Sequence, residues 1–266
     1  MTHHHDAQHL TTAAFWEEHW ADVRLPYAID LRSYRWHCYD QLLRRILPAG
    51  SANLLEVGAG LCQWLAYFEH RFGLRTFGLD NAFGVCRVGA TNTRLLEVPV
   101  RLACADALAA PFAERTFDVV FSDGVIEHFD DPRPILASMA RLLRPGGVLV
   151  ASVPNFAGWA GWARRLVDPE VAHTHRALTA GDLVRALREV GLEQVRVEHF
   201  GSFRPPYLPV VHGHGAGRVL GVPGRVALRA IDRALTGVYR ATDRSWESAL
   251  VSAEIMAVAA APRSST

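Results

Sequence analysis

The stretch Asn53-Leu-Leu-Glu-Val-Gly-Ala-Gly60 decides the fold of this chain. Its short apolar run predicts a buried strand, and the glycines that interrupt it predict a tight loop. Because Gly58 and Gly60 have no Cβ atom, a ligand can approach the backbone closely at this loop. The segment 61–72 then has the apolar spacing of a helix. A strand, a glycine turn and a helix in this order are typical of a nucleotide pocket at the carboxyl edge of an open parallel sheet.

Two further predicted strands end in carboxylates. The segment 75–80 ends in Asp80, about 20 residues after the turn, where an acidic side chain can accept hydrogen bonds from both ribose hydroxyls. The segment 100–106 ends in Asp106, which suits an acceptor for an adenine amino group. A dinucleotide-binding loop would need a third glycine where Gln63 stands. The sequence therefore argues against a dinucleotide cofactor of the nicotinamide type, and so against an oxidoreductase.

Four blocks of sequence follow one another between residues 50 and 155. They are Leu55–Gly60, Gly78–Asp80, Ala105–Phe112 and Phe117–Pro154. In this order they resemble the class I S-adenosylmethionine-dependent methyltransferases, in particular the small-molecule branch that includes the ubiquinone-pathway methyltransferases. One departure is Cys62, which stands where members of the family often carry a third glycine.

The resemblance implies S-adenosylmethionine as the cofactor, and it implies a role for each matching residue. Glu56 and the glycine turn would shape the methionine end of the pocket, and Asp80 would hold the ribose. Asp106 and the backbone of Ala107 would read the adenine, while the end of the fourth strand would face the sulfur and the substrate. The cofactor-binding residues implied in this way are Glu56, Gly58, Ala59, Gly60, Asp80, Asn81, Asp106, Ala107, Ser122 and Asp123.

Two histidines are candidates for a catalytic base. Methyl transfer from a sulfonium requires mainly a well-placed acceptor and, where needed, removal of its proton. His128 follows the fourth predicted strand, and His175 precedes a predicted helix; a neutral imidazole near pH 7 suits proton removal, although either histidine could instead be a packing residue. In the ubiquinone-pathway enzymes the matching Glu-His pair belongs to an acidic metal-binding motif. Here Gly124 replaces the third carboxylate, so no metal site is predicted.

The expected fold class is α/β, a doubly wound, mostly parallel seven-stranded sheet with an antiparallel last strand. We expect an N-terminal helical extension or lid at residues 1–48, and a Rossmann-like core at residues 49–200 and 248–262. Residues 201–247 form an insertion between strands six and seven that contains a predicted basic amphipathic helix. Such a helix could lie on a membrane surface, but a helix that covers the pocket or meets a partner is the favoured interpretation.

Composition limits the remaining possibilities. The 266 residues carry a formal net charge of +1, and scattered arginines give no basic block that would indicate a nucleic-acid partner. The four cysteines, Cys38, Cys62, Cys86 and Cys104, fit neither a zinc site nor a disulfide framework, so we expect reduced thiols, with Cys104 buried. With no apolar run of about 18 residues and no secretion signal, the expected location is cytoplasmic.

The sequence thus predicts a methyltransferase acting on an oxygen or nitrogen of a small metabolite. The aromatic residues of the N-terminal extension favour an aromatic or apolar-bodied acceptor, such as a quinone-like compound or one of secondary metabolism. A methyltransferase acting on protein or nucleic acid is an alternative, and so is a non-catalytic cofactor-binding or lipid-surface module. The acceptor atom and the oligomeric state are left open.

Overall fold

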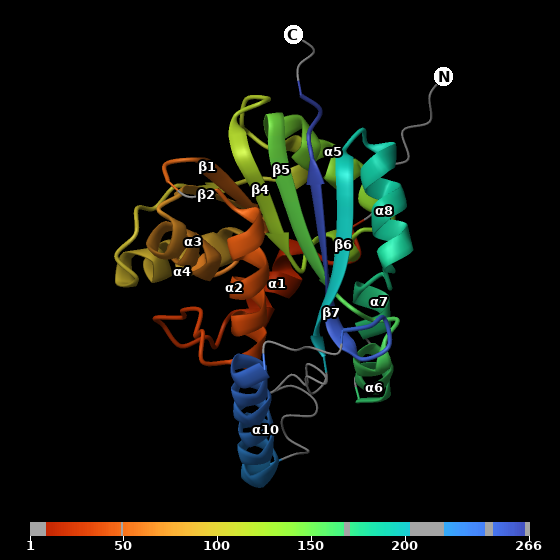
Figure 1. Cartoon of the computed structure of the whole chain (residues 1–266). Coiled ribbons are helices and arrows are strands. Elements are labelled where there is room, and N and C mark those ends of the chain that lie inside the picture. The colour runs from red at the N-terminus through yellow and green to blue at the C-terminus, as the bar shows by residue number, and fades with distance from the viewer. Residues whose placement is uncertain (1–8, 49, 168–170, 203–220, 243–246, 264–266) are drawn as a thin grey trace.

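The structure is a computed structural model, and it describes residues 9–48, 50–167, 171–202, 221–242 and 247–263 (Figure 1). Its centre is one seven-stranded sheet with the strand order β3-β2-β1-β4-β5-β7-β6. All neighbours pair in parallel except β7, which runs antiparallel to both β5 and β6. The predicted fold class is therefore confirmed. The strands are β1 (Asn53–Val57), β2 (Arg75–Asp80), β3 (Leu102–Cys104), β4 (Phe117–Asp123), β5 (Leu143–Pro154), β6 (Glu193–Ser202) and β7 (Ser252–Ala260).

Helices cover both faces of the sheet (Figure 1). Side chains alternate along each strand, so Leu55 and Val120 face a core that includes α5 and α8. Leu54 and Val119 face a second core, which is built with α2 and α3. The helices are α1 (Ala13–His19), α2 (Tyr34–Ile46), α3 (Gln63–Phe72), α4 (Phe83–Leu95), α5 (Pro132–Leu142), α6 (Trp159–Val167), α7 (Val171–Thr174), α8 (Ala180–Glu189) and α10 (Gly221–Thr242), with short 3₁₀ turns at Ala107–Ala109 and Ile126–His128.

Local sequence signals set the ends of several helices. The Asp131 carboxylate accepts a hydrogen bond from the Arg133 amide at the start of α5, as the Asp131-Pro132 pair predicts. Thr179 and Asp182 form the predicted capping box of α8. Helix α3 begins two residues later than predicted, because Cys62 adopts a left-handed conformation with φ 60° and belongs to the turn.

The prediction that Cys104 is buried is wrong. Strand β3 has only three residues and lies at the edge of the sheet, which leaves this thiol exposed. The other three cysteines are buried. Strand β3 is also shorter than the segment 100–106 that the apolar pattern predicted.

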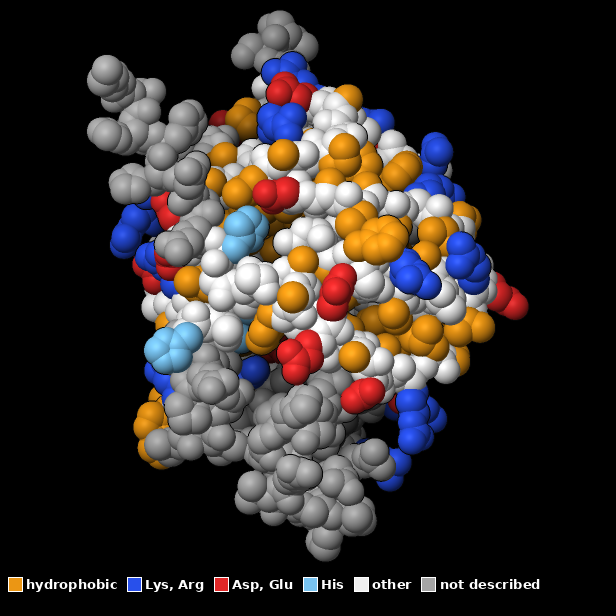
Figure 2. Space-filling view, turned by 180° about the vertical axis from the view of Figure 1, so that it is seen from behind, with side chains coloured by type: hydrophobic (Ala, Val, Ile, Leu, Met, Phe, Trp, Pro, Cys, Tyr) orange, Lys and Arg blue, Asp and Glu red, His pale blue; other side chains and the backbone are white. Residues whose placement is uncertain are grey.

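Helix α10 belongs to the segment between β6 and β7, and it packs against the C-terminal part of the N-terminal extension (Figure 1). Leu235 and Tyr239 join the core that includes α2, whereas Ile231 and Val238 are exposed. Among the described helices, none combines the length and apolar character needed to span a membrane. On the face seen from behind, basic side chains are scattered rather than gathered in one patch (Figure 2).

Two glycines inside helices offer a matched test of packing. A Cβ atom on Gly89 in α4 would lie 2.6 Å from the Gly60 carbonyl oxygen and 2.7 Å from the Cys62 Sγ, whereas Gly237 in α10 has nothing within 4 Å. We expect Gly89→Ala to lower the free energy of unfolding by about 1–3 kcal/mol, because the backbone carbonyl cannot move aside. Gly237→Ala should instead raise it by up to about 1 kcal/mol, because alanine is the better helix former.

Urea-induced unfolding of the two variants and the parent measures both effects. A Gly89→Ala protein as stable as the parent would show that α4 does not press against the glycine turn in solution.

Candidate active site

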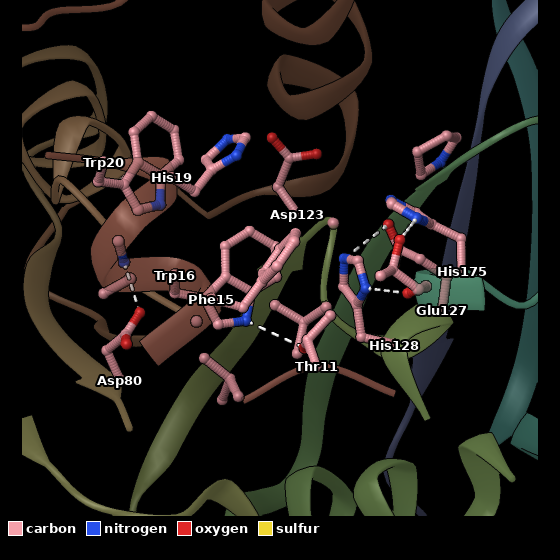
Figure 3. A pocket seen from close by; sticks show the side chains of 18 of the residues that line it. Thr11, Phe15, Trp16, His19, Trp20, Asp80, Asp123, Glu127, His128 and His175 are labelled. Carbon is pink, nitrogen blue, oxygen red and sulfur yellow. Dashed lines mark hydrogen bonds and ion pairs between the residues drawn. The ribbon is translucent and has the colours of Figure 1, made fainter. Parts of the chain in front are cut away.

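A cavity of about 860 Å³ lies at the carboxyl edge of the sheet. The ends of β1, β2 and β4 form its floor. Helix α1 covers it, and Figure 3 shows Phe15 and Trp16 of this helix beside the cavity. An open parallel sheet is expected to bind ligands at this edge. The volume is within the range of cavities that bind small molecules and cofactors.

The glycine turn and the end of β2 are joined directly. The Gly60 amide donates a hydrogen bond of 2.9 Å to the Asp80 carboxylate, which also accepts one of 3.0 Å from the Ala82 amide. Gly58 adopts a φ of +74°, and a Cβ atom there would collide with the Val125 side chain. Burial raises the pKa of Asp80. The turn therefore requires glycine at position 58 and holds the Asp80 carboxylate against the cavity.

Most of the residues implied by the resemblance line this one cavity. Asp80 and Asp106, which follow two neighbouring strands, both do so. Asp106 is half exposed and accepts a hydrogen bond of 2.9 Å from the Leu108 amide, which fixes its side chain. The implied residues in the cavity wall are Glu56, Gly58, Ala59, Gly60, Asp80, Asn81, Asp106, Ala107 and Asp123.

Ser122 is the exception. Its side chain is 1% exposed and is not part of the cavity wall, because successive side chains of β4 point to opposite faces of the sheet. Its neighbour Asp123 therefore faces the cavity while Ser122 faces the core.

Glu56 is a buried carboxyl group at the floor of the cavity. It is 1% exposed, and within the described part of the chain its Oε2 atom has no hydrogen-bond partner. Burial raises its pKa well above the ordinary range, and the nearby carboxylates of Asp123 and Asp80 raise it further. A buried polar atom that points into a cavity is a position where a bound ligand can supply the missing hydrogen bond.

The pKa of Asp123, at the end of β4, is shifted in the opposite direction. Burial alone would raise its pKa, but the Arg35 guanidinium and hydrogen bonds from Tyr39, Ser152 and Trp64 outweigh burial and lower it. Arg35 and Tyr39 belong to α2, so the N-terminal extension supplies part of this site. Sequence reasoning named neither residue as functional. Their spacing of four residues, which puts them on one face of a helix, was the available signal.

His128 and His175 come together at the other end of the cavity, beside Glu127 (Figure 3). The His128 Nδ1 lies 2.5 Å from the Thr174 carbonyl oxygen, which can only accept, so Nδ1 carries the proton and Nε2 has the lone pair. Burial lowers the pKa of His128 to about 4. Its imidazole is therefore neutral at physiological pH.

Glu127 is missing from the sequence-based candidates although it precedes His128. It is 1% exposed, and burial raises its pKa to about 8. Its Oε1 lies 4.0 Å from the His128 Nε2. Potential donor atoms of Glu127, His128 and His175 all lie within 4.8 Å of one another, close enough to share a divalent ion. Two imidazoles and one carboxylate suit Zn²⁺ or another transition metal better than Mg²⁺.

Helix α1 forms an aromatic wall over the cavity. Phe15, Trp16 and Trp20 line it, and the Trp16 ring meets the His128 ring edge-on with centroids 4.9 Å apart. Two contacts hold the segment down. The Glu17 carboxylate accepts a hydrogen bond of 2.8 Å from the Gly84 amide at the start of α4, and the Leu10 amide donates one of 2.8 Å to the His128 carbonyl oxygen.

Comparison with known proteins agrees with this geometry. Residues 55–151 match a family model described as a methyltransferase domain. A ubiquinone biosynthesis O-methyltransferase of Cereibacter sphaeroides is 31% identical over 171 residues, which cover 59% of this chain and 66% of that relative, slightly less than two thirds of its length.

Solved structures share the fold. A possible histamine N-methyltransferase of Thermotoga maritima superposes with a TM-score of 0.59 at 15% identity, covering 85% of this chain and 89% of its own. The [4+2]-cyclase SpnF gives a TM-score of 0.58 at 21% identity, covering 84% of this chain and 80% of its own. At such identities the likeness concerns the fold alone.

The glycine turn, the carboxylates at the strand ends and the matched domain agree with one another. The chain thus contains a methyltransferase domain, residues 55–151, in the fold of the S-adenosylmethionine-dependent methyltransferases.

Proposed function

We propose that this protein transfers a methyl group from S-adenosylmethionine to an oxygen or nitrogen atom of a small molecule with an aromatic or apolar body. The observation that carries the proposal is that Asp80 and Asp106 line the same cavity as the glycine turn. In this assignment Asp80 binds the ribose hydroxyls and Asp106 binds the adenine amino group. The methionine part then extends over Gly58 toward the end of β4.

The far end of the cavity suits the acceptor. His128 presents an unprotonated Nε2, and Trp16, Phe15 and Phe156 supply apolar walls around it. A neutral imidazole can accept the proton of a phenol or an amine while a lone pair of the phenol oxygen or amine nitrogen attacks the methyl carbon. His175, whose ring lies 4.3 Å from that of His128 between centroids, is the second candidate for this role. The aromatic walls favour a planar acceptor ring.

A metal-assisted variant of the same reaction has one specific observation in its favour. The donor atoms of Glu127, His128 and His175 are close enough to bind one divalent ion. Such an ion would lower the pKa of a bound acceptor hydroxyl in place of a histidine base. Activity that is lost on adding EDTA and restored by a divalent salt would favour this variant.

Replacing either strand-end carboxylate should weaken cofactor binding. We expect Asp80→Ala and Asp106→Ala each to weaken binding of S-adenosylmethionine by about 1.5–3 kcal/mol, because each removes charged hydrogen-bond acceptors for ligand donors. Isothermal titration calorimetry measures the change. Asp30→Ala, at an exposed position outside the cavity wall, is the control. Parent protein that does not bind the cofactor, or variants that bind it fully, would reject the proposal.

Replacing the candidate base should separate binding from chemistry. We expect His128→Gln to keep its affinity for S-adenosylmethionine while methyl transfer falls by about 10²–10⁴-fold, the usual contribution of a general base. Formation of S-adenosylhomocysteine with a panel of catechols, phenols and arylamines is the assay. His70→Gln is the control, since this histidine is exposed and outside the cavity wall. A fully active His128→Gln enzyme would exclude His128 as the base.

The raised pKa of Glu127 predicts a dependence of stability on pH. Folding keeps this carboxyl protonated up to about pH 8, whereas in the unfolded chain it has its ordinary pKa of 4.5. The parent therefore loses stability through this group as the pH rises between these values. Glu127→Gln has no such loss, so its free energy of unfolding relative to the parent should increase by on the order of 3 kcal/mol from about pH 5 to about pH 8.

Urea unfolding of both proteins in EDTA at several pH values tests this expectation. A difference between parent and variant that stays constant with pH would mean that Glu127 is ionised in the folded protein.

A further inference from the structure

A buried network of charges joins the N-terminal extension to the floor of the cavity. The Arg35 guanidinium pairs with the Asp123 carboxylate at 3.2 Å and with the Glu254 carboxylate at 2.7 Å. The Tyr39 hydroxyl lies 2.6 Å from Asp123 Oδ1 and 3.1 Å from Glu254 Oε2. The Ser152 hydroxyl donates a further hydrogen bond of 2.7 Å to Asp123. Helix α2 and strands β4, β5 and β7 thus meet in one network of hydrogen bonds and ion pairs.

Among the charged side chains of Arg35, Asp123 and Glu254, negative charge exceeds positive charge. One guanidinium is shared by two carboxylates, so the three side chains have one net negative charge when both carboxylates are ionised. The Asp123 side chain is only 11% exposed, which keeps water from screening it. Arg35, Asp123 and Glu254 all line the cavity, so this charge acts on whatever the cavity holds.

The position of Asp123 matches the reacting part of the donor. Strands β1 and β4 pair in parallel with Glu56 opposite Phe121, so Gly58 and Asp123, each two residues further on, lie at neighbouring strand ends. With the adenosine over β2 and β3, the sulfonium would lie beyond the glycine turn, between Asp80 and the histidine pair. The Asp123 carboxylate points toward α2 and acts on this region through its charge rather than through contact (Figure 3).

We propose that Tyr39 and Arg35 are positioning residues that hold Asp123 as a carboxylate, so that the cavity prefers the positively charged donor over its neutral product. In the transfer the carbon–sulfur bonding pair stays on sulfur, which turns a sulfonium cation into a neutral thioether. A fixed negative charge nearby therefore favours the donor before the reaction and loses that attraction afterwards. This inference rests on the proposed function.

The test compares three ligands that are similar in shape but differ in the charge at the position of the sulfur. S-adenosylmethionine and sinefungin, which has an amine in place of the methylsulfonium, are cationic at this point, and S-adenosylhomocysteine is neutral. Calorimetry gives the Kd of each ligand for the parent, Asp123→Asn, Tyr39→Phe and Ser152→Ala. For Asp123→Asn we expect the Kd of both cationic ligands to rise about tenfold and that of S-adenosylhomocysteine to change by less than about twofold. The ratio of the Kd of S-adenosylhomocysteine to that of a cationic ligand measures the preference for positive charge. Tyr39→Phe and Ser152→Ala should lower this ratio by about three- to fivefold, because each removes one hydrogen bond to the carboxylate.

Tyr67→Phe is the matched control. The Tyr67 hydroxyl donates a hydrogen bond of 2.8 Å to the Asp40 carboxylate in the same core, but Tyr67 does not line the cavity. The Tyr67→Phe variant loses an equivalent tyrosine–aspartate hydrogen bond, and it should leave the ratio of the Kd values unchanged. A variant that only disturbs the structure would change the Kd of all three ligands by the same factor.

Each outcome decides the inference. A fall in the preference for cationic ligands in Asp123→Asn and the hydroxyl variants, with none in Tyr67→Phe, supports it. A preference that is unchanged in Asp123→Asn and Ser152→Ala overturns it even where Tyr39→Phe does not fold, while the proposed function stands because the parent binds the ligands. A parent that binds none of the three overturns both.

Discussion

The parallel pairing of β1 with β2 on one side and β4 on the other is the constraint on which the site depends. Glu56 lies opposite Gly78 in β2 and Phe121 in β4, which fixes where all three strands end. Their loops then leave the same edge of the sheet, and the Gly60 amide can reach the Asp80 carboxylate. A shift of one residue in either register would turn these side chains to the other face of the sheet, and the cavity would lose the residues that line it.

Buried carboxyl groups in this cavity fall into two classes. Asp123 receives an arginine and three hydrogen-bond donors, and its pKa is lowered although burial alone would raise it. Glu56 and Glu127 have no comparable partners among the residues that the structure describes, and burial raises the pKa of each. One cavity thus holds a fixed negative charge between two carboxyl groups whose environments favour the protonated form. Desolvation penalises every buried charge, and only local partners decide which group keeps it.

Sequence reasoning was most successful where the signal is local. The glycine turn, the capping residues of α5 and α8 and the mostly parallel sheet with an antiparallel last strand follow from short-range patterns. The contacts of Arg35 could not be found in this way, because its two carboxylate partners lie 88 and 219 residues further along the chain. The tautomer of His128 depends on a carbonyl 46 residues away, and the exposure of Cys104 depends on β3 being a short edge strand.

The unequal exposure of the cysteines has a practical consequence. Cys38, Cys62 and Cys86 are buried, whereas Cys104 is exposed and precedes by two residues the Asp106 of the cavity wall. A maleimide dye added to the native protein would therefore attach at one sulfur close to the end of the cavity where Asp106 lies. The unaltered chain thus comes with its own attachment point for a fluorescent reporter of ligand occupancy.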